Sequence, residues 1–242
     1  MLEVEGLTKL YGDRPAVQGL TFRVGPGEIL GLVGPNGAGK TTTLRTIAGI
    51  LPATSGKVVV AGHDLGTDPL KAKGALAFVP DEPSLFEYLT AEEHLEFTAR
   101  LYGCPDDPKR REALLDQFQL LPKRRSLADE LSRGMKQKLT LACALIHDPA
   151  LLLMDEPLTG LDPVGIRQVK DLLLARARAG AAIVLSSHLL PLIEEICSRL
   201  LFLHRGAIAA AGTQQELAKA YPGLNGLEAI FLSVTGDGEA GK

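Results

Sequence analysis

One stretch decides the fold of this 242-residue chain: GPNGAGKT, at residues 34–41. It matches the pattern G-x-x-x-x-G-K-[ST] and lies between an apolar run at residues 28–33 and a predicted helix over residues 40–51. The glycines allow backbone N–H groups to turn around an anion, and the helix that follows presents the positive end of its dipole there. The lysine of such a loop reaches the phosphates of a nucleotide, and the hydroxyl after it binds Mg²⁺. The stretch therefore predicts a phosphate-binding loop in an α/β fold, rather than a tight turn with a solvated lysine.

Two adjacent carboxylates follow a second predicted strand. Residues 151–154 are LLLM, an apolar run typical of a parallel strand covered on both faces, and Asp155 and Glu156 come directly after it. Ligands of parallel α/β sheets bind at this carboxyl edge. Asp155 can hold Mg²⁺ through water, and Glu156 can polarise an attacking water as a general base. A strand that ends in an ordinary Asp-Glu helix cap is the alternative, which the phosphate-binding loop makes less favourable.

The composition is that of a globular protein, and it excludes several classes. Hydrophobic residues make up 45% and charged residues 23% of the chain, and the formal net charge is −3. This balance argues against a surface that binds nucleic acid over its whole extent. No apolar run approaches the roughly 18 residues needed to cross a bilayer. Cys104, Cys143 and Cys197 are too far apart for a zinc site and odd in number, which predicts reduced thiols rather than a disulfide framework.

Capping boxes mark two further helices. Thr90 with Glu93 begins a helix inside a segment that is more charged and more helical than its surroundings. Thr213 with Glu216 begins a short helix after the last predicted strand. The first of these helices interrupts the α/β pattern, which resumes after it, so we expect an insertion into an α/β core.

We expect one domain over residues 1–242. Its predicted parts are an antiparallel β region plus α/β core (residues 1–80 and 132–215), a helical insertion (residues 81–131) and a C-terminal tail (residues 216–242) whose last stretch is frayed.

Five short motifs stand in the order typical of one family. Residues 131–137, LSRGMKQ, resemble the signature motif of ATP-binding cassette (ABC) ATPases. The phosphate-binding loop precedes this motif, and DE at 155–156, GLD at 160–162 and SSH at 186–188 follow it, so the resemblance covers nearly the whole chain. Neither asparagine of the chain is followed by lysine, so the Asn-Lys-x-Asp guanine reader of a GTPase is missing from the sequence. Five motifs in order are far more specific than one glycine-rich loop.

The resemblance implies a P-loop NTPase fold, with a RecA-like parallel core, an antiparallel β subdomain and an inserted helical subdomain. It implies an ATP-binding and ATP-hydrolysing subunit of an ABC transporter, with ATP and Mg²⁺ as cofactors. The implied partners are a second copy of the chain or a related ABC subunit, joined on ATP binding, and separate transmembrane permease subunits. No nucleic-acid partner is expected, and the implied location is cytoplasmic, peripheral on the inner face of the cell membrane.

The resemblance also assigns roles to single residues. Glu156 and His188 would be catalytic, with His188 contacting the γ-phosphate. Nucleotide contacts are expected from Tyr11, Val17, Asn36, Gly37, Ala38, Gly39, Lys40, Thr41 and Thr42. Magnesium contacts are expected from Thr41, Asp81 and Asp155. Contacts across the dimer, to the nucleotide held by the second copy, are expected from Ser132, Gly134 and Asp162.

The chain departs from the family pattern at a position expected to contact magnesium. The family usually has glutamine after the strand predicted at residues 75–79, and this chain has Asp81 there, with Glu82 as the alternative alignment. A carboxylate one methylene shorter then replaces an amide. Asp81 could still accept a hydrogen bond from a magnesium-bound water, although with a shorter reach.

The alternative function is that of a soluble ABC ATPase in an iron–sulphur cluster assembly complex, which has a similar length and no membrane partner. Within transporters, two features favour an exporter of the ABC-2 type over an importer. One is the short C-terminal region, and the other is a signature motif in which Arg133 and Met135 replace the usual glycine and glutamine.

Overall fold

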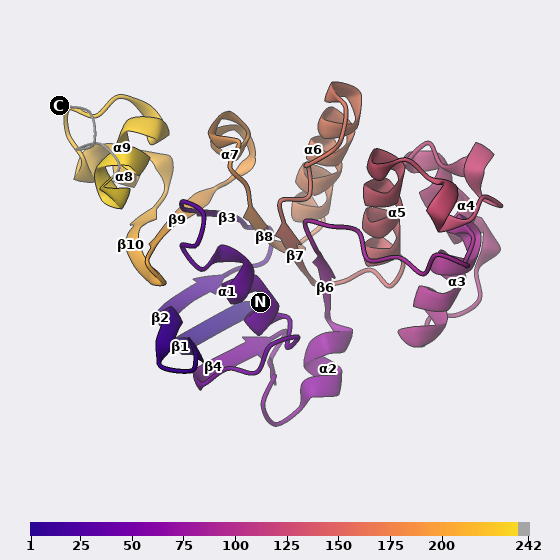
Figure 1. Ribbon diagram of the computed structural model, residues 1–242, viewed down its shortest axis with the longest axis horizontal. Coiled ribbons are helices and arrows are strands. Elements are labelled where there is room, and N and C mark those ends of the chain that lie inside the picture. Colours follow the sequence, from indigo (N-terminus) through magenta and orange to yellow (C-terminus); the bar gives the residue numbers. More distant parts are fainter. Residues whose placement is uncertain (237–242) are drawn as a thin grey trace.

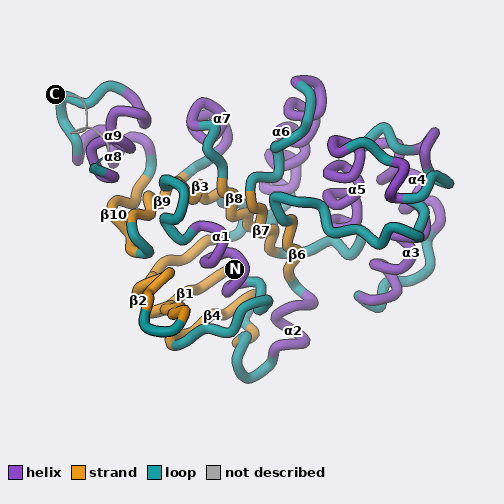
Figure 2. Tube along the Cα trace, in the orientation of Figure 1, coloured by secondary structure: helices purple, strands orange, loops and turns teal. Residues whose placement is uncertain are grey.

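The computed structural model describes residues 1–236, which form two sheets with helices packed around them (Figures 1 and 2). The strands are β1 (Leu2–Tyr11), β2 (Arg14–Val24), β3 (Ile29–Val33), β4 (Ser55–Val60), β5 (His63–Asp64), β6 (Leu76–Val79), β7 (Leu151–Asp155), β8 (Ala182–Ser186), β9 (Arg199–His204) and β10 (Ala207–Gly212). The α-helices are α1 (Lys40–Ile47), α2 (Pro69–Gly74), α3 (Ala91–Leu101), α4 (Pro108–Gln117), α5 (Arg133–Leu145), α6 (Pro163–Arg178), α7 (Leu190–Ile196), α8 (Gln214–Ala220) and α9 (Gly226–Thr235).

The smaller sheet is antiparallel and has the strand order β2-β1-β4-β5. β1 pairs with β2 as a hairpin on one side and with β4 on the other. Leu2, Val4 and Leu7 of β1 are fully buried, so one face of this sheet packs into the core. This confirms the predicted antiparallel β region.

The larger sheet has the order β10-β9-β3-β8-β7-β6. All pairs from β9 to β6 are parallel, and only the edge strand β10 is antiparallel. Every residue of β3, β7 and β8 is buried, as expected for parallel strands covered on both faces. Side chains of β7 alternate between two cores, since Leu152 and Met154 pack on one face while Leu151 and Leu153 pack on the other.

Helix α1 lies between the two sheets (Figure 1). It contacts β7 of the larger sheet and β1 and β2 of the smaller one. Leu44 and Ile47 are fully buried in the core that the two sheets share. This packing holds the loop between β3 and α1 at the carboxyl edge of the parallel strands.

The helices of the predicted insertion pack with α5 at one end of the molecule. α3, α4 and α5 lie together, away from the smaller sheet (Figure 1). α5 contacts both α3 and α4, and it also contacts β6 of the larger sheet. The boundary predicted at residue 131 therefore separates α5 from the helices that it packs against, because a sequence break marks where a segment begins and not what it touches.

The C-terminal region contains more structure than the tail we expected. The Thr213–Glu216 capping box is confirmed at the start of α8. The expectation of a frayed end is wrong for α9, whose Leu227 and Ile230 are buried and which contacts β9. The apolar residues of GLEAIFLSVT form this packed helix, and the remaining part of the predicted tail, residues 237–242, lies outside the described residues.

Within residues 1–236, none of the helices combines the length and the apolar character that spanning a bilayer requires.

Candidate nucleotide-binding site

The predicted phosphate-binding loop connects the end of β3 to the start of α1. Gly39 is the N-cap of α1 with φ of 104°, and no side chain caps this helix. A Cβ on Gly39 would lie 2.5 Å from the carbonyl oxygen of Ala16, so the turn requires glycine. The first backbone N–H groups of α1 are therefore free to bind an anion at the carboxyl edge of the sheet.

A cavity of about 270 Å³ lies over this loop. It brings together the predicted phosphate-binding residues and three carboxylates from distant parts of the chain. Its lining residues are Ala16, Asn36, Gly37, Ala38, Gly39, Lys40, Thr41, Thr42, Asp81, Asp155 and Glu156. Residues separated by more than a hundred positions thus face one space.

Lys40 is held within its own loop. Its Nζ donates hydrogen bonds to the carbonyl oxygens of Gly34 (2.6 Å) and Pro35 (3.1 Å). Burial lowers the pKa of Lys40, while the carboxylates of Glu156 and Asp155 act in the opposite direction. An anion in the cavity would favour the charged ammonium further, which suits a phosphate-binding role.

Asp155 is the last residue of β7 and is 1% exposed. Its Oδ1 accepts a 2.6 Å hydrogen bond from the hydroxyl of Ser186, which lies opposite it in the register of β8. Its Oδ2 is buried and has no hydrogen-bond partner among the described residues. A buried carboxylate oxygen without a partner calls for an explanation, and a divalent cation, which prefers oxygen ligands, supplies one. The residues present therefore fit a magnesium ion.

Glu156 has a strained backbone and a fixed side chain. Its φ is 46°, a left-handed conformation that costs a non-glycine residue about 1–3 kcal/mol and occurs preferentially at functional sites. Its backbone N–H donates to the carbonyl oxygen of Ser186 (3.1 Å). Its Oε2 lies 2.8 Å from Nδ1 of His188 and accepts a longer hydrogen bond from the His188 backbone. The structure thus brings the two predicted catalytic residues into direct contact.

The residues predicted to act across a dimer lie outside this cavity. Ser132 is the N-cap of α5 and accepts a hydrogen bond from the N–H three residues later, as its sequence position predicts. A Cβ on Gly134 would lie 2.9 Å from the carbonyl oxygen of Gly160, so the start of α5 packs against the loop that follows β7. That loop ends at Asp162, the N-cap of α6. Ser132, Gly134 and Asp162 are not among the lining residues given above.

Two predicted nucleotide contacts also lie outside the lining. Tyr11 is at the end of β1 and is 52% exposed. Val17 is fully buried in the core and is not among the lining residues of the cavity. Its neighbour Ala16 lines the cavity instead. Successive side chains of a strand point to opposite faces, so the alternation along β2 is the signal that could have identified Ala16.

Asp81 is part of the cavity wall, whereas Glu82 is not among its described lining residues. Asp81 Oδ1 lies 4.0 Å from Nη2 of Arg45. Sequence reasoning assigned no role to Arg45, or to Ser186 beyond its place in the SSH motif at residues 186–188. Arg45 follows Thr41 by four residues on one helix, and this spacing is a signal that could have placed it near the cavity.

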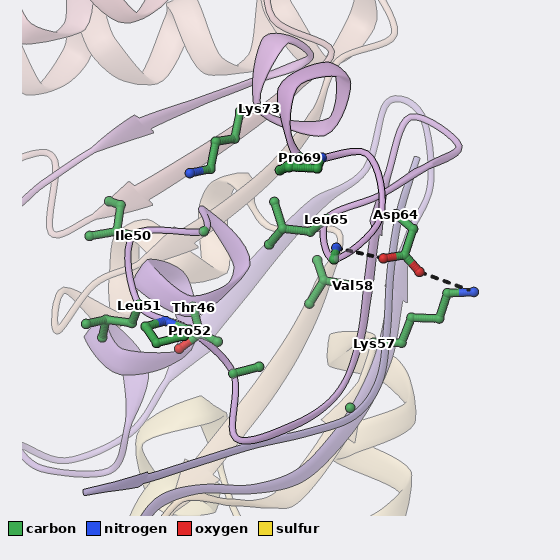
Figure 3. Close-up of a pocket in the computed structure, with 14 residues that line it drawn as sticks. Thr46, Ile50, Leu51, Pro52, Lys57, Val58, Asp64, Leu65, Pro69 and Lys73 are labelled. Carbon is green, nitrogen blue, oxygen red and sulfur yellow. Dashed lines mark hydrogen bonds and ion pairs between the residues drawn. The ribbon is translucent and has the colours of Figure 1, made fainter.

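A second, larger cavity of about 550 Å³ lies at the other end of α1 (Figure 3). Ile50, Leu51 and Val58 contribute apolar walls, and the ion pair between Lys57 and Asp64 (3.5 Å) lies on one side. The predicted phosphate-binding residues do not line it. Size alone therefore does not select the cavity over the predicted phosphate-binding loop.

The family model described as ABC transporter matches residues 17–159. The chain is 35% identical over 239 residues to the ABC-type transporter ATP-binding protein EcsA of Bacillus subtilis, an alignment that covers 97% of this chain and 96% of that protein. It is 35% identical over 242 residues to the linearmycin resistance ATP-binding protein LnrL of the same organism, covering 99% of this chain and 77% of that protein.

Solved structures agree with these relatives. A structure described as the ATP binding subunit of an ABC transporter superposes with a TM-score of 0.92 at 34% identity, covering 97% of this chain and 99% of that one. A dimeric ATP-binding cassette in a post-hydrolysis state, bound to ADP and Pi, superposes with a TM-score of 0.81. The alignment with this cassette has 24% sequence identity and covers 88% of this chain and 98% of the other, which indicates a common fold.

Proposed function

The chain belongs to the ABC transporter family as an ATP-binding and ATP-hydrolysing subunit, and we propose how its own residues carry out this reaction. The observation that carries the proposal is the single cavity shared by Lys40, Thr41, Asp155 and Glu156. The description of the matching family model and the name of EcsA favour a transporter subunit over the iron–sulphur assembly alternative.

The triphosphate binds over the start of α1. Backbone N–H groups of residues 37–42 and the ammonium of Lys40 hold the phosphate oxygens, as the dipole and the uncapped N-terminus of the helix favour. Lys40 then exchanges its hydrogen bonds to Gly34 and Pro35 for bonds to phosphate. Tyr11, which is half exposed, is our candidate for stacking on the adenine ring.

Thr41, Asp155 and Asp81 are the residues that would hold Mg²⁺. When bound, the ion neutralises charge on the phosphates. The support for this assignment is the buried Oδ2 of Asp155, which has no hydrogen-bond partner among the described residues, in the same cavity as the other two side chains.

Glu156 is our candidate for the general base. His188 occupies Oε2, so we assign the role of proton acceptor from the attacking water to Oε1. The strained backbone of Glu156 and its bond to Ser186 fix the direction of the side chain. His188 is the more exposed of the pair, with 67% of its side chain accessible, and can contact the γ-phosphate from the open side.

A second copy of the chain, or a related subunit, completes the site. Ser132, Gly134 and Asp162 lie at the starts of α5 and α6, outside their own chain's cavity. The start of α5 offers N–H groups and a positive dipole end to an anion, whereas α6 offers the polar side chain of Asp162. We propose that they contact the nucleotide of the partner copy, so that two sites form at one dimer seam.

Separate membrane subunits are the second proposed kind of partner, in addition to the second copy of the chain. Phe86 and Phe97 are 57% and 45% exposed, and their ring centroids lie 5.3 Å apart beside the segment that follows Asp81. Tyr88, two residues after Phe86, is 85% exposed. Exposed aromatic side chains gathered on one surface are typical of protein interfaces. Docking of permease subunits there, at the inner face of the cell membrane, would connect partner motion to the carboxylate in the cavity.

The Glu156→Gln variant tests the proposal. We expect ATP hydrolysis to fall by two or more orders of magnitude, since general bases contribute about 10²- to 10⁴-fold, while ATP binding persists. The Lys40→Ala variant is the contrast, because it removes a phosphate ligand and should lose binding and hydrolysis together. The measurements are phosphate release and fluorescent nucleotide binding. Unchanged hydrolysis in Glu156→Gln would remove Glu156 as the base.

A further inference from the structure

Three carboxylates and one ammonium line the phosphate cavity. The carboxylates belong to Asp81, Asp155 and Glu156, and the ammonium belongs to Lys40. The lining side chains therefore carry two net negative charges. A nucleotide triphosphate is itself a polyanion, and like charges in a partly enclosed site repel each other. The backbone N–H groups of the loop attract phosphate but contribute only partial charges. The cavity is therefore poorly suited to a triphosphate that arrives without a divalent cation.

Asp81 is the carboxylate that changes this balance. Asp155 and Glu156 belong to the motif through which the chain resembles its family. Asp81, in the alignment expected from the sequence, stands where the family usually has an uncharged amide. We propose that Asp81 makes nucleotide binding by this chain depend on a divalent cation much more strongly than an amide at this position would. The inference rests on the proposed function of the cavity and deepens it.

The cavity offers a cation more than a cluster of acids. Asp155 is 1% exposed, and its Oδ2 has no hydrogen-bond partner among the described residues. The hydroxyl-bearing Thr41 and the carboxylate of Asp81 line the same space. A buried oxygen without a partner, a hydroxyl and a second carboxylate match the oxygen ligands that Mg²⁺ prefers. With a cation present, the charge of Asp81 attracts the cation, and this attraction offsets its repulsion of the phosphates.

Arg45 offsets part of the charge of Asp81. Its Nη2 lies 4.0 Å from Asp81 Oδ1, and the two side chains are 42% and 46% exposed. An ion pair with this separation and exposure is weak and easily exchanged. Arg45 therefore moderates the repulsion of a metal-free nucleotide without withdrawing Asp81 from the cavity wall.

The experiment measures the dissociation constant of a fluorescent ATP analogue twice, in Mg²⁺ and in EDTA. In the wild-type chain we expect far weaker binding in EDTA. The ratio of interest is the dissociation constant in EDTA divided by that in Mg²⁺. In Asp81→Asn and Asp81→Gln we expect this ratio to fall by about tenfold or more, mainly through tighter binding in EDTA, because one nearby negative charge is removed. Two variants with different amide lengths separate the effect of charge from that of side-chain size.

Glu82→Gln is the matched control, since it removes one negative charge from the adjacent position, which is not among the described lining residues. We expect its ratio to equal that of the wild type. Arg45→Gln should weaken binding in EDTA, and combining it with Asp81→Asn should restore binding toward the level of the single Asp81→Asn variant. Thermal unfolding of each variant establishes that it is folded.

Two results overturn the inference: an unchanged ratio in both folded Asp81 variants, or an equal change in Glu82→Gln. Neither result concerns whether the cavity binds nucleotide. A wild-type chain that fails to bind the analogue in Mg²⁺ would instead contradict the proposed function itself.

Discussion

At the scale of single residues, Ser186 determines how the acidic pair after β7 is presented. Its hydroxyl donates to Asp155 Oδ1 (2.6 Å), and its carbonyl oxygen accepts from the backbone N–H of Glu156 (3.1 Å). One residue of β8 thus restrains both a proposed metal ligand and the proposed general base. This leaves Oδ2 as the oxygen of Asp155 that is available to a ligand.

We predict that Ser186→Ala lowers the free energy of unfolding by about 1–3 kcal/mol, because it leaves a buried carboxylate oxygen without its donor. It should also reduce ATP hydrolysis, since Asp155 is then less well oriented. Urea unfolding and phosphate release are the measurements.

Ser187→Ala is the control for this prediction. Ser187 is also buried, and its hydroxyl accepts a hydrogen bond from the Leu189 N–H. Among the described residues, no hydrogen bond joins this hydroxyl to Asp155 or Glu156. Its effect on hydrolysis should be smaller. Equal losses of hydrolysis in the two variants would argue against a specific role for Ser186.

At the scale of elements, His94 joins helix α3 to the segment that carries Asp81. The Phe86 N–H donates to His94 Nε2 (2.9 Å), and His94 Nδ1 lies 2.8 Å from the Thr90 carbonyl oxygen. A carbonyl oxygen can only accept and an N–H can only donate, so Nδ1 carries the proton and the ring is neutral. Protonation of Nε2 would break the bond that anchors this segment to α3.

Stability should therefore fall in mildly acidic solution. Burial lowers the pKa of His94 below its ordinary value of 6.5. As the pH falls from 6.5 toward that lowered pKa, the unfolded chain binds the proton first, so the free energy of unfolding decreases; above pH 6.5 the stabilisation is complete. His94→Gln should remove this part of the pH dependence, and it should cost about 1 kcal/mol at pH 8 through the altered hydrogen bonds.

Urea unfolding at several pH values between 8 and 5 measures both effects. The pKa of His147 is also lowered by burial, but His147 is present in both proteins, so the difference between them isolates His94. Carboxyl groups with lowered pKa, such as that of Glu93, act below pH 4.5. Parallel pH profiles for the wild type and the variant would contradict the prediction.

Local patterns predicted much of this site, and long-range register supplied the rest. The loop around Lys40, the strand before Asp155 and the Thr90 and Thr213 capping boxes depend on neighbours within a few residues, so the sequence indicates them directly. The Ser186–Asp155 bond depends on the pairing of β7 with β8, whose residues are 31 positions apart. No local pattern specifies that pairing.

Helix α9 was missed for a related reason. Its sequence lies next to a Gly-rich and acidic end that suggested fraying, and its stability comes from packing. Ile230 is 2% exposed, and the ring of Phe231 lies 6.5 Å from that of Phe202 in β9. Tertiary contacts of this kind override the local composition.

At the scale of the whole molecule, the nucleotide cavity and the surface with Ser132 and Asp162 are separate parts of one chain. The cavity lies over the loop between β3 and α1, whereas the other surface is built by the starts of α5 and α6. A chain with both parts can pair with a second copy so that each cavity meets the other's helix starts. Two copies arranged in this way form a closed two-fold assembly with two sites.

This arrangement separates ATP binding from dimerisation experimentally. In Glu156→Gln, MgATP should convert the 25.7 kDa chain into a species of twice that mass, because bound ATP is not hydrolysed. Adding Ser132→Arg places a long side chain at the start of α5 and should leave the mass unchanged. Its own cavity is untouched, so MgATP at about 100 times its dissociation constant should still stabilise the doubly substituted chain by about 2.7 kcal/mol.

Size-exclusion chromatography with light scattering measures the mass, and thermal unfolding measures the stabilisation. For a chain of this length, each kcal/mol corresponds to roughly 2–4 °C in Tm, so nucleotide alone should raise Tm by about 5–11 °C. In Glu156→Gln the rise should also grow with protein concentration, because dimerisation is bimolecular, whereas with Ser132→Arg it should not. A doubly substituted chain that still dimerises in MgATP would place the seam elsewhere on the molecule, and one that loses the thermal shift altogether would mean that Ser132 acts on its own cavity.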